Sequence, residues 1–149
     1  TTKEGKAFHI DTPDCVVAIL ELERCPLVRL TANFYVRDTR QAGIEFHGDK
    51  GSLHLGNFQR FNTTVAYAPF GEGLKDVPLV REGFDGTEWG RGVREMAAAI
   101  REGRPHRATG QQAAHVVEIL NAATTSSLTG RPVAVKSTFP QPEPMDWGK

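Results

Sequence analysis

The chain has 149 residues, of which 39% are hydrophobic and 24% are charged, as is typical of one globular domain with its own core. Eighteen basic residues balance eighteen acidic ones, so the composition gives no electrostatic reason to expect nucleic acid or an anionic membrane as a partner. No apolar run reaches the roughly 20 residues that cross a bilayer, and no targeting pattern opens the sequence. The composition favours a soluble protein that binds a small neutral molecule or another protein surface.

Of the two cysteines, Cys15 opens a predicted strand and Cys25 lies in the turn that follows it. Extended backbone spans about 3.3 Å per residue, which places the two sulfur atoms far beyond bridging distance. Two reduced thiols in a cytoplasmic protein are therefore the simpler interpretation. The sequence begins at Thr1 without an initiator methionine, and we interpret it as a fragment of a longer protein.

Two alternating runs predict a first β-hairpin. Residues 15–22 carry apolar side chains on both faces, and residues 27–36 have one apolar face, with a turn at residues 23–26 between them. A second hairpin is predicted around the turn from Gly48 to Gly51. Its apolar face comprises Ile44, Phe46, Leu53 and Leu55, and its polar face comprises Glu45, His47, Ser52 and His54.

Further along the chain, residues 62–68 predict another strand, and residues 69–86, with four glycines and two prolines, predict a long loop. Thr87 is a predicted N-cap for a first helix, which Gly103 ends. Thr109 and Gln112 form a predicted capping box for a second helix, which Gly130 ends. A short strand is predicted at residues 132–136, followed by an extended, proline-rich tail at residues 140–149.

Together these elements predict an α+β fold: an open, mainly antiparallel sheet with two helices on one face. The other face carries Val17, Ile19, Leu27 and Tyr35 and has no further element to cover it. An exposed apolar patch of this kind usually marks an interface, so we expect this face to be available for oligomerisation. The alternative is that the long loop folds across it.

Few side chains suggest chemistry. Glu45, His47 and His54 share one hairpin face, but a metal site lacks a fourth ligand and a solvated polar face is the stronger interpretation. His115 lies near the apolar stripe of the second helix, where a satisfied buried or interfacial histidine is expected rather than a catalytic base. No pattern supports His9 or His106.

Charged residues recur around the first helix and in one loop. The arginines at 91, 94, 101, 104 and 107 alternate with glutamates at 88, 95 and 102, which predicts a solvated helix face. The loop with Arg37, Asp38 and Arg40 can hydrogen-bond a polyol, although an ordinary surface loop explains it equally well.

Several runs resemble one known family. They are TPD at 12–14, IEFHGDKGSL at 44–53, AIREGRP at 99–105, HVVEIL at 115–120 and TGRPV at 129–133. In this order and spacing they resemble the carboxy-terminal domain of the Gfo/Idh/MocA family of nicotinamide-dependent sugar and cyclitol oxidoreductases. The resemblance extends from about residue 12 to residue 135, and we assign residues 1–139 to this domain.

The resemblance implies a Rossmann domain that precedes this one and is absent from the sequence. It implies that NAD or NADP and the catalytic residues lie there, so that this chain holds no catalytic, cofactor-binding or metal-binding residue and is inactive alone. Substrate contacts map to Arg37, Asp38 and Arg40, where relatives often carry aromatic residues. The open sheet face is implied to join copies of the chain.

Two hypotheses remain open. In the first, the chain is the substrate-side and oligomerisation domain of a cytoplasmic, homo-oligomeric NAD(P)-dependent dehydrogenase of sugar or inositol metabolism, with a small polyol as substrate. In the second, it is a stand-alone dimerising or small-ligand-binding module that never had a cofactor domain.

Overall fold

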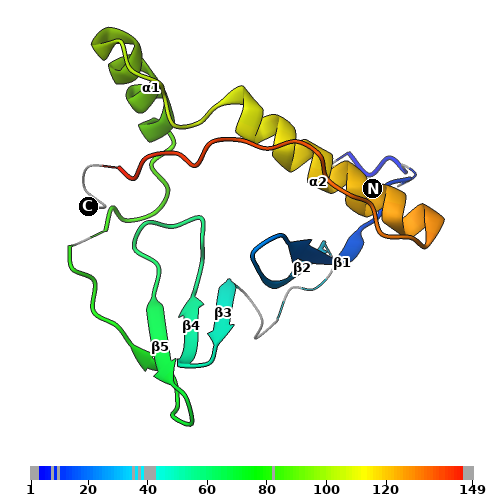
Figure 1. Cartoon of the computed structure of the whole chain (residues 1–149), viewed down its shortest axis with the longest axis horizontal. Helices are drawn as coiled ribbons and strands as arrows, with labels where there is room; N and C mark the ends of the chain where they lie inside the picture. The colour runs from blue at the N-terminus through cyan, green and yellow to red at the C-terminus, as the bar shows by residue number, and fades with distance from the viewer. Residues whose placement is uncertain are drawn as a thin grey trace. The chain divides into compact units, whose positions relative to one another are not determined.

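The computed structural model describes residues 4–7, 9, 11–34, 36, 38, 43–81 and 83–145. The chain divides into two compact units, Thr1–Gln41 and Ala42–Lys149. The described elements are two helices and two open antiparallel sheets, which confirms the predicted α+β class (Figure 1). The strands differ from the prediction in one respect, because they form a two-stranded and a four-stranded sheet rather than a single one.

The first unit contains a hairpin of β1 (Cys15–Leu22) and β2 (Cys25–Asn33). Their antiparallel register pairs Ala18 with Leu30, so the alternating apolar residues share one face as predicted. The turn is shorter than predicted, because β2 already begins at Cys25. Cys15 and Cys25 therefore lie at opposite ends of the hairpin, and Cys15 is a free thiol.

The four-stranded sheet has the order β3-β4-β5-β6. Its strands are β3 (Ile44–Gly48), β4 (Gly51–Leu55), β5 (Val65–Pro69) and β6 (Lys75–Asp76), and all pairs are antiparallel. The predicted pairs Ile44 with Leu55 and Phe46 with Leu53 are confirmed. The prediction of an unbroken loop at residues 69–86 was wrong in one detail, since β6 forms there and adds a short edge to the sheet.

Helix α1 (Arg91–Glu102) begins later than predicted. Its N-cap is Gly90 without a side-chain cap, and the Thr87 hydroxyl instead donates to the carbonyl oxygen of Gln59 at 2.8 Å. The predicted Thr87 cap was therefore wrong. The predicted end is confirmed, because Gly103 adopts the left-handed conformation with φ of 65°.

Helix α2 (Gly110–Thr129) has the predicted boundaries. The Thr109 hydroxyl accepts from the amide of Gln112 at 3.2 Å, and Gly130 ends the helix at φ of 65°. After Gly130 the chain turns back and runs along α2 (Figure 1). It forms no strand over residues 131–145, so the strand predicted at residues 132–136 was wrong.

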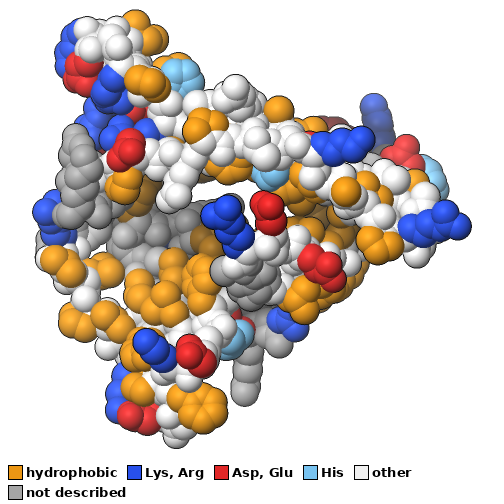
Figure 2. All heavy atoms as spheres, in the orientation of Figure 1, with side chains coloured by type: hydrophobic (Ala, Val, Ile, Leu, Met, Phe, Trp, Pro, Cys, Tyr) orange, Lys and Arg blue, Asp and Glu red, His pale blue; other side chains and the backbone are white. Residues whose placement is uncertain are grey.

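Much apolar surface is uncovered in the described part of the chain. The buried hydrophobic residues there are Ala66, Ala68 and Ala99. Phe46 on the apolar face of the four-stranded sheet is 57% exposed, and Ile100 on α1 is 73% exposed. Figure 2 shows hydrophobic side chains at the surface over β3–β5. Apolar surface on this scale is typical of a domain that docks against other surfaces.

Candidate functional site

The predicted substrate loop is only partly visible. Asp38 is exposed, whereas Arg37 and Arg40 lie outside the described residues, as does Tyr35. Just after β2, the Asn33 side-chain oxygen accepts from the amide of Val36 at 3.1 Å and turns the chain toward this loop. The role of Asp38 in substrate binding stays a prediction, as do those of Arg37 and Arg40.

On the polar hairpin face, Glu45 and His47 are exposed, whereas Ser52 and His54 are half-buried. His47 Nδ1 lies 2.9 Å from Ser52 Oγ, and His47 Nε2 lies 3.6 Å from Glu45 Oε2. His54 stands opposite Glu45 in the register. Across the residues that the structure covers, no group of three His, Cys, Asp or Glu side chains is placed to hold a metal ion. These contacts are those of a polar surface in water, where charge pairs contribute little stability.

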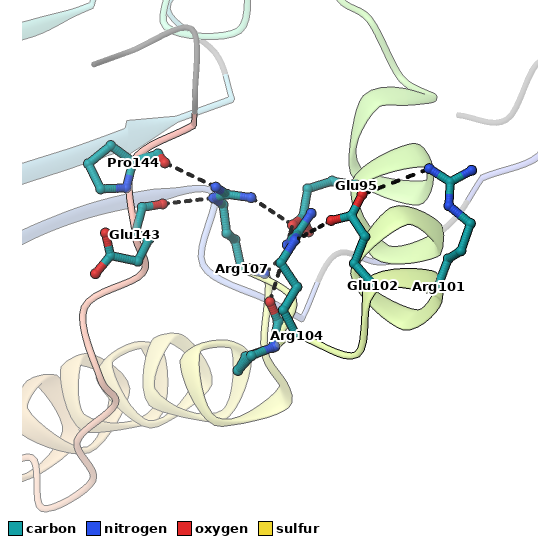
Figure 3. Close-up of polar contacts among 8 residues, drawn as sticks. Glu95, Arg101, Glu102, Arg104, Arg107, Glu143 and Pro144 are labelled. Carbon is teal, nitrogen blue, oxygen red and sulfur yellow. Dashed lines mark hydrogen bonds and ion pairs between the residues drawn. The ribbon is translucent and has the colours of Figure 1, made fainter.

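A cluster of ionic contacts lies where α1 ends and the chain turns toward α2 (Figure 3). The Glu95 carboxylate, whose side chain is only 9% exposed, accepts from Arg104 Nη1 at 2.6 Å and from Arg107 Nη1 at 2.8 Å. The amide of Arg107 adds a third contact at 3.2 Å. Arg104 Nε also donates to Glu102 at 2.8 Å. For Glu95, Arg104 and Arg107, the prediction of a solvated helix face was wrong.

The charges of this cluster are matched. The Arg104 guanidinium outweighs the effect of burial and, with Arg107, lowers the pKa of Glu95 from 4.5 to about 2. Hydrogen bonds to Glu95 and Glu102 raise the pKa of Arg104 in turn. Glu95 and Arg104 are therefore both ionised at neutral pH and bind each other.

Arg107 also binds the C-terminal segment. Its Nε donates to the carbonyl oxygen of Glu143 at 2.8 Å, and its Nη2 donates to that of Pro144 at 3.0 Å (Figure 3). The described part of the predicted tail, residues 140–145, is in neither a helix nor a strand, and these two hydrogen bonds attach it to Arg107. The remaining tail, residues 146–149, lies outside the described residues.

A second contact with the same segment lies on α2. The Glu118 carboxylate accepts from the amide of Lys136 at 2.8 Å and from the amide of Ser137 at 2.9 Å. The Ser137 hydroxyl, followed by these two amides, lowers the pKa of Glu118 to about 2. Sequence reasoning missed this residue, although a lone carboxylate within the apolar run 116–120 was the signal.

His115 completes the contact. Its Nδ1 lies 2.9 Å from Ser137 Oγ, and its ring is tilted by 57° against Phe139 with centroids 5.2 Å apart. A satisfied histidine was predicted here, and the structure confirms it. The residue packs and hydrogen-bonds within the fold instead of facing a ligand.

Two hollows are the other candidates for a ligand site. One of about 160 Å³ beside β5 and β6 offers Asn62, Thr64 and Asp76, but pockets that enclose a ligand usually measure about 300–1,000 Å³. The other, of about 670 Å³, lies open along the first turns of α2 against mainly apolar side chains such as Val116 and Val117. The first is too small to enclose a polyol, and the second offers it few hydrogen bonds.

Comparison with known proteins identifies the family. The model of the Gfo/Idh/MocA family, described as "Oxidoreductase family, C-terminal alpha/beta domain", matches residues 3–135. Comparisons with curated proteins and with solved structures gave no match. Neither helix in the described ranges is long and apolar enough to cross a membrane. Because the family model covers most of the sequence and the fold is α+β, the chain belongs to the Gfo/Idh/MocA oxidoreductase family, as its C-terminal alpha/beta domain.

Proposed function

We propose that this chain is the substrate-side and oligomerisation domain of a cytoplasmic NAD(P)-dependent dehydrogenase that acts on a sugar, cyclitol or related polyol. The observation that carries the proposal is the family match over residues 3–135. A second domain would complete the substrate site.

The nicotinamide cofactor does not fit the described residues. A dinucleotide site places a glycine-rich turn between a strand and the N-terminus of a helix, where free amides bind the pyrophosphate. Helix α2 instead follows α1, and the Thr109 hydroxyl already accepts from the Gln112 amide in its first turn. We therefore place the cofactor and the redox step on residues outside this sequence, so that this chain alone is inactive.

Calorimetry tests the cofactor part of the proposal. The chain by itself should give no heat of binding with NAD or NADP at micromolar concentrations, whereas the intact protein should bind one of them. Micromolar affinity of the isolated chain for either dinucleotide would overturn this part.

For the substrate, we propose that Arg37, Asp38 and Arg40 hydrogen-bond its hydroxyl groups. Charged groups form stronger hydrogen bonds than neutral ones, and the Asp38 side chain is exposed. The intact protein should reduce NAD or NADP in the presence of a polyol, as measured by nicotinamide absorbance over a panel of sugars and cyclitols.

Alanine at any of these three positions should lower kcat/KM for the substrate about ten- to a hundredfold, or about 1.4 to 2.7 kcal/mol, with the KM for cofactor unchanged. Asp49→Ala, which removes an exposed carboxylate in the β3–β4 turn, is the matched control and should keep wild-type kinetics. Wild-type kinetics in all three alanine variants would reduce the segment to an ordinary surface loop. A stand-alone binding module would instead show no nicotinamide reduction with any member of the panel.

For the assembly, we propose that the open face of the β1–β2 hairpin joins two or more copies of the protein. Three apolar side chains of this face, Val17, Ile19 and Leu27, are each more than half exposed. Burying them against a second copy would remove apolar surface from water, which is the main favourable contribution to protein association. A self-complementary face of this kind is typical of two-fold homo-oligomers.

A further inference from the structure

Residues 136–145, here named the strap, touch the rest of their unit at two distant points. At one end the Glu118 carboxylate binds the amides of Lys136 and Ser137. At the other end the Arg107 guanidinium binds the carbonyl oxygens of Glu143 and Pro144. The strap therefore runs antiparallel to α2, from the middle of the helix to the loop before it.

The Arg107 guanidinium is shared between the strap and α1. Nε and Nη2 donate to the strap, while Nη1 donates to Glu95 of α1 at 2.8 Å. The guanidinium is a rigid planar fork whose donors point in fixed directions. One flat group binds the Glu143 and Pro144 carbonyl oxygens and the Glu95 carboxylate together. A shift of either the strap or α1 therefore breaks at least one of these hydrogen bonds.

The contact at Glu118 does not depend on this junction. It joins α2 to residues 136 and 137, and His115 holds the same place through Ser137 and Phe139. The near end of the strap thus remains attached to α2 when the far end is released. The two ends can be tested separately for this reason.

We propose that the strap is a conformational coupling device: Arg107 links the docking of the C-terminal segment to the orientation of α1. By thermodynamic linkage the effect is reciprocal, so loss of the strap loosens α1 and loss of the Glu95 contact loosens the far end of the strap. Within the described residues, the Arg107 side chain thus joins the far end of the strap to α1.

Amide hydrogen exchange, followed by mass spectrometry on the intact protein, tests the coupling. Truncation after Pro142 removes both carbonyl acceptors of Arg107 and should accelerate exchange in α1 by about fivefold or more. Arg107→Lys keeps the charge but lacks the fork, and its effect should be at least as large because it also loses the Nη1 contact with Glu95. Truncation should add nothing further to exchange in α1 of Arg107→Lys, because that variant has already lost both contacts with the strap.

Two matched control variants distinguish this coupling from a general rise in amide exchange caused by any substitution. Glu143→Gln changes a side chain but leaves the main-chain carbonyl that Arg107 uses, and Arg101→Lys changes an exposed arginine of α1. Both should exchange like the wild type. Exchange in β3–β5 should stay at the wild-type rate in every variant, which shows that the sheet remains folded.

Wild-type exchange in α1 after truncation would overturn the proposal, as would additive effects of truncation and Arg107→Lys. If Arg107→Lys also accelerates amide exchange in β3–β5, that variant has loosened the whole unit. The truncated protein alone then tests the coupling, because it keeps the side chains of Glu95, Arg104 and Arg107. Reciprocity has its own test, since Glu95→Gln should lower the NMR order parameters of the Glu143 and Met145 amides while leaving the Ser137 amide protected by Glu118.

Discussion

Gly51 is a position where a single added methyl group should damage the four-stranded sheet. It opens β4 opposite Pro69 of β5 and has φ of +148°. A Cβ atom at Gly51 would lie 2.1 Å from the carbonyl oxygen of Ala68 and 3.0 Å from Cα of Pro69. Both are backbone atoms, so the two strands must separate locally in a Gly51→Ala variant.

Two penalties combine in that variant. A left-handed φ costs a residue with a side chain roughly 1–2 kcal/mol, and displacing packed backbone costs about 1–3 kcal/mol. The smaller entropy of the unfolded chain returns only about 0.4–1 kcal/mol. We therefore expect Gly51→Ala to lower the free energy of unfolding by about 2–4 kcal/mol.

Gly48, at the other end of the same turn, is the matched control. A Cβ atom there would have its nearest neighbour at 3.9 Å, and Gly48 has no positive φ. Gly48→Ala should therefore be neutral or slightly stabilising. Urea unfolding of the intact protein, followed by circular dichroism, should place the Gly51→Ala midpoint about 1–2 M below that of Gly48→Ala. Equal midpoints would refute the register that places Gly51 against Pro69.

Three further outcomes are expected. Thr109→Ala removes the N-cap of α2 and should lower the free energy of unfolding by about 1 kcal/mol in thermal melts, whereas Thr109→Ser should not; equal melting of all three proteins would contradict the cap. The folded-state pKa of Glu95 and of Glu118 is about 2, below the ordinary 4.5, so their stabilisation is complete above pH 4.5 and is lost as the pH falls toward 2. Acid unfolding of Glu118→Gln should then show a weaker dependence on pH in that window, and a curve with the wild-type slope would argue against it. Finally, Ile19→Glu should give folded monomers in sedimentation velocity while Glu23→Lys, in the turn, keeps the assembly; a wild-type protein that is monomeric at high concentration would remove the basis of the assembly proposal.

The sequence predicted the elements whose signals are local. Period-two alternation and paired glycines were enough to give the register of β3 and β4, and the Thr109 cap with Gly130 gave both ends of α2. Thr87 carried the same kind of signal and failed, because its hydroxyl binds a carbonyl 28 residues away. A capping residue cannot be recognised where a distant partner competes for it.

The polar junction was not predictable for the same reason. Glu95 binds arginines 9 and 12 residues further on, across the turn at Gly103, whereas helical charge pairs are expected at three or four residues. The strand expected at residues 132–136 does not form, and the amide of its last residue, Lys136, binds the Glu118 carboxylate together with the amide of Ser137. Composition alone does not reveal such contacts between a helix side chain and a distant main chain.

The strap is bound through its main chain at both ends, with the side chains of Ser137 and Phe139 adding contacts at the near end only. Glu118 binds amide hydrogens and Arg107 binds carbonyl oxygens, one of them from a proline, which lacks an amide hydrogen but keeps its acceptor. The side chains at positions 141 and 143 can therefore vary, whereas Glu118 and Arg107 cannot. We expect most substitutions in the strap to be tolerated and substitutions of Glu118 or Arg107 not to be.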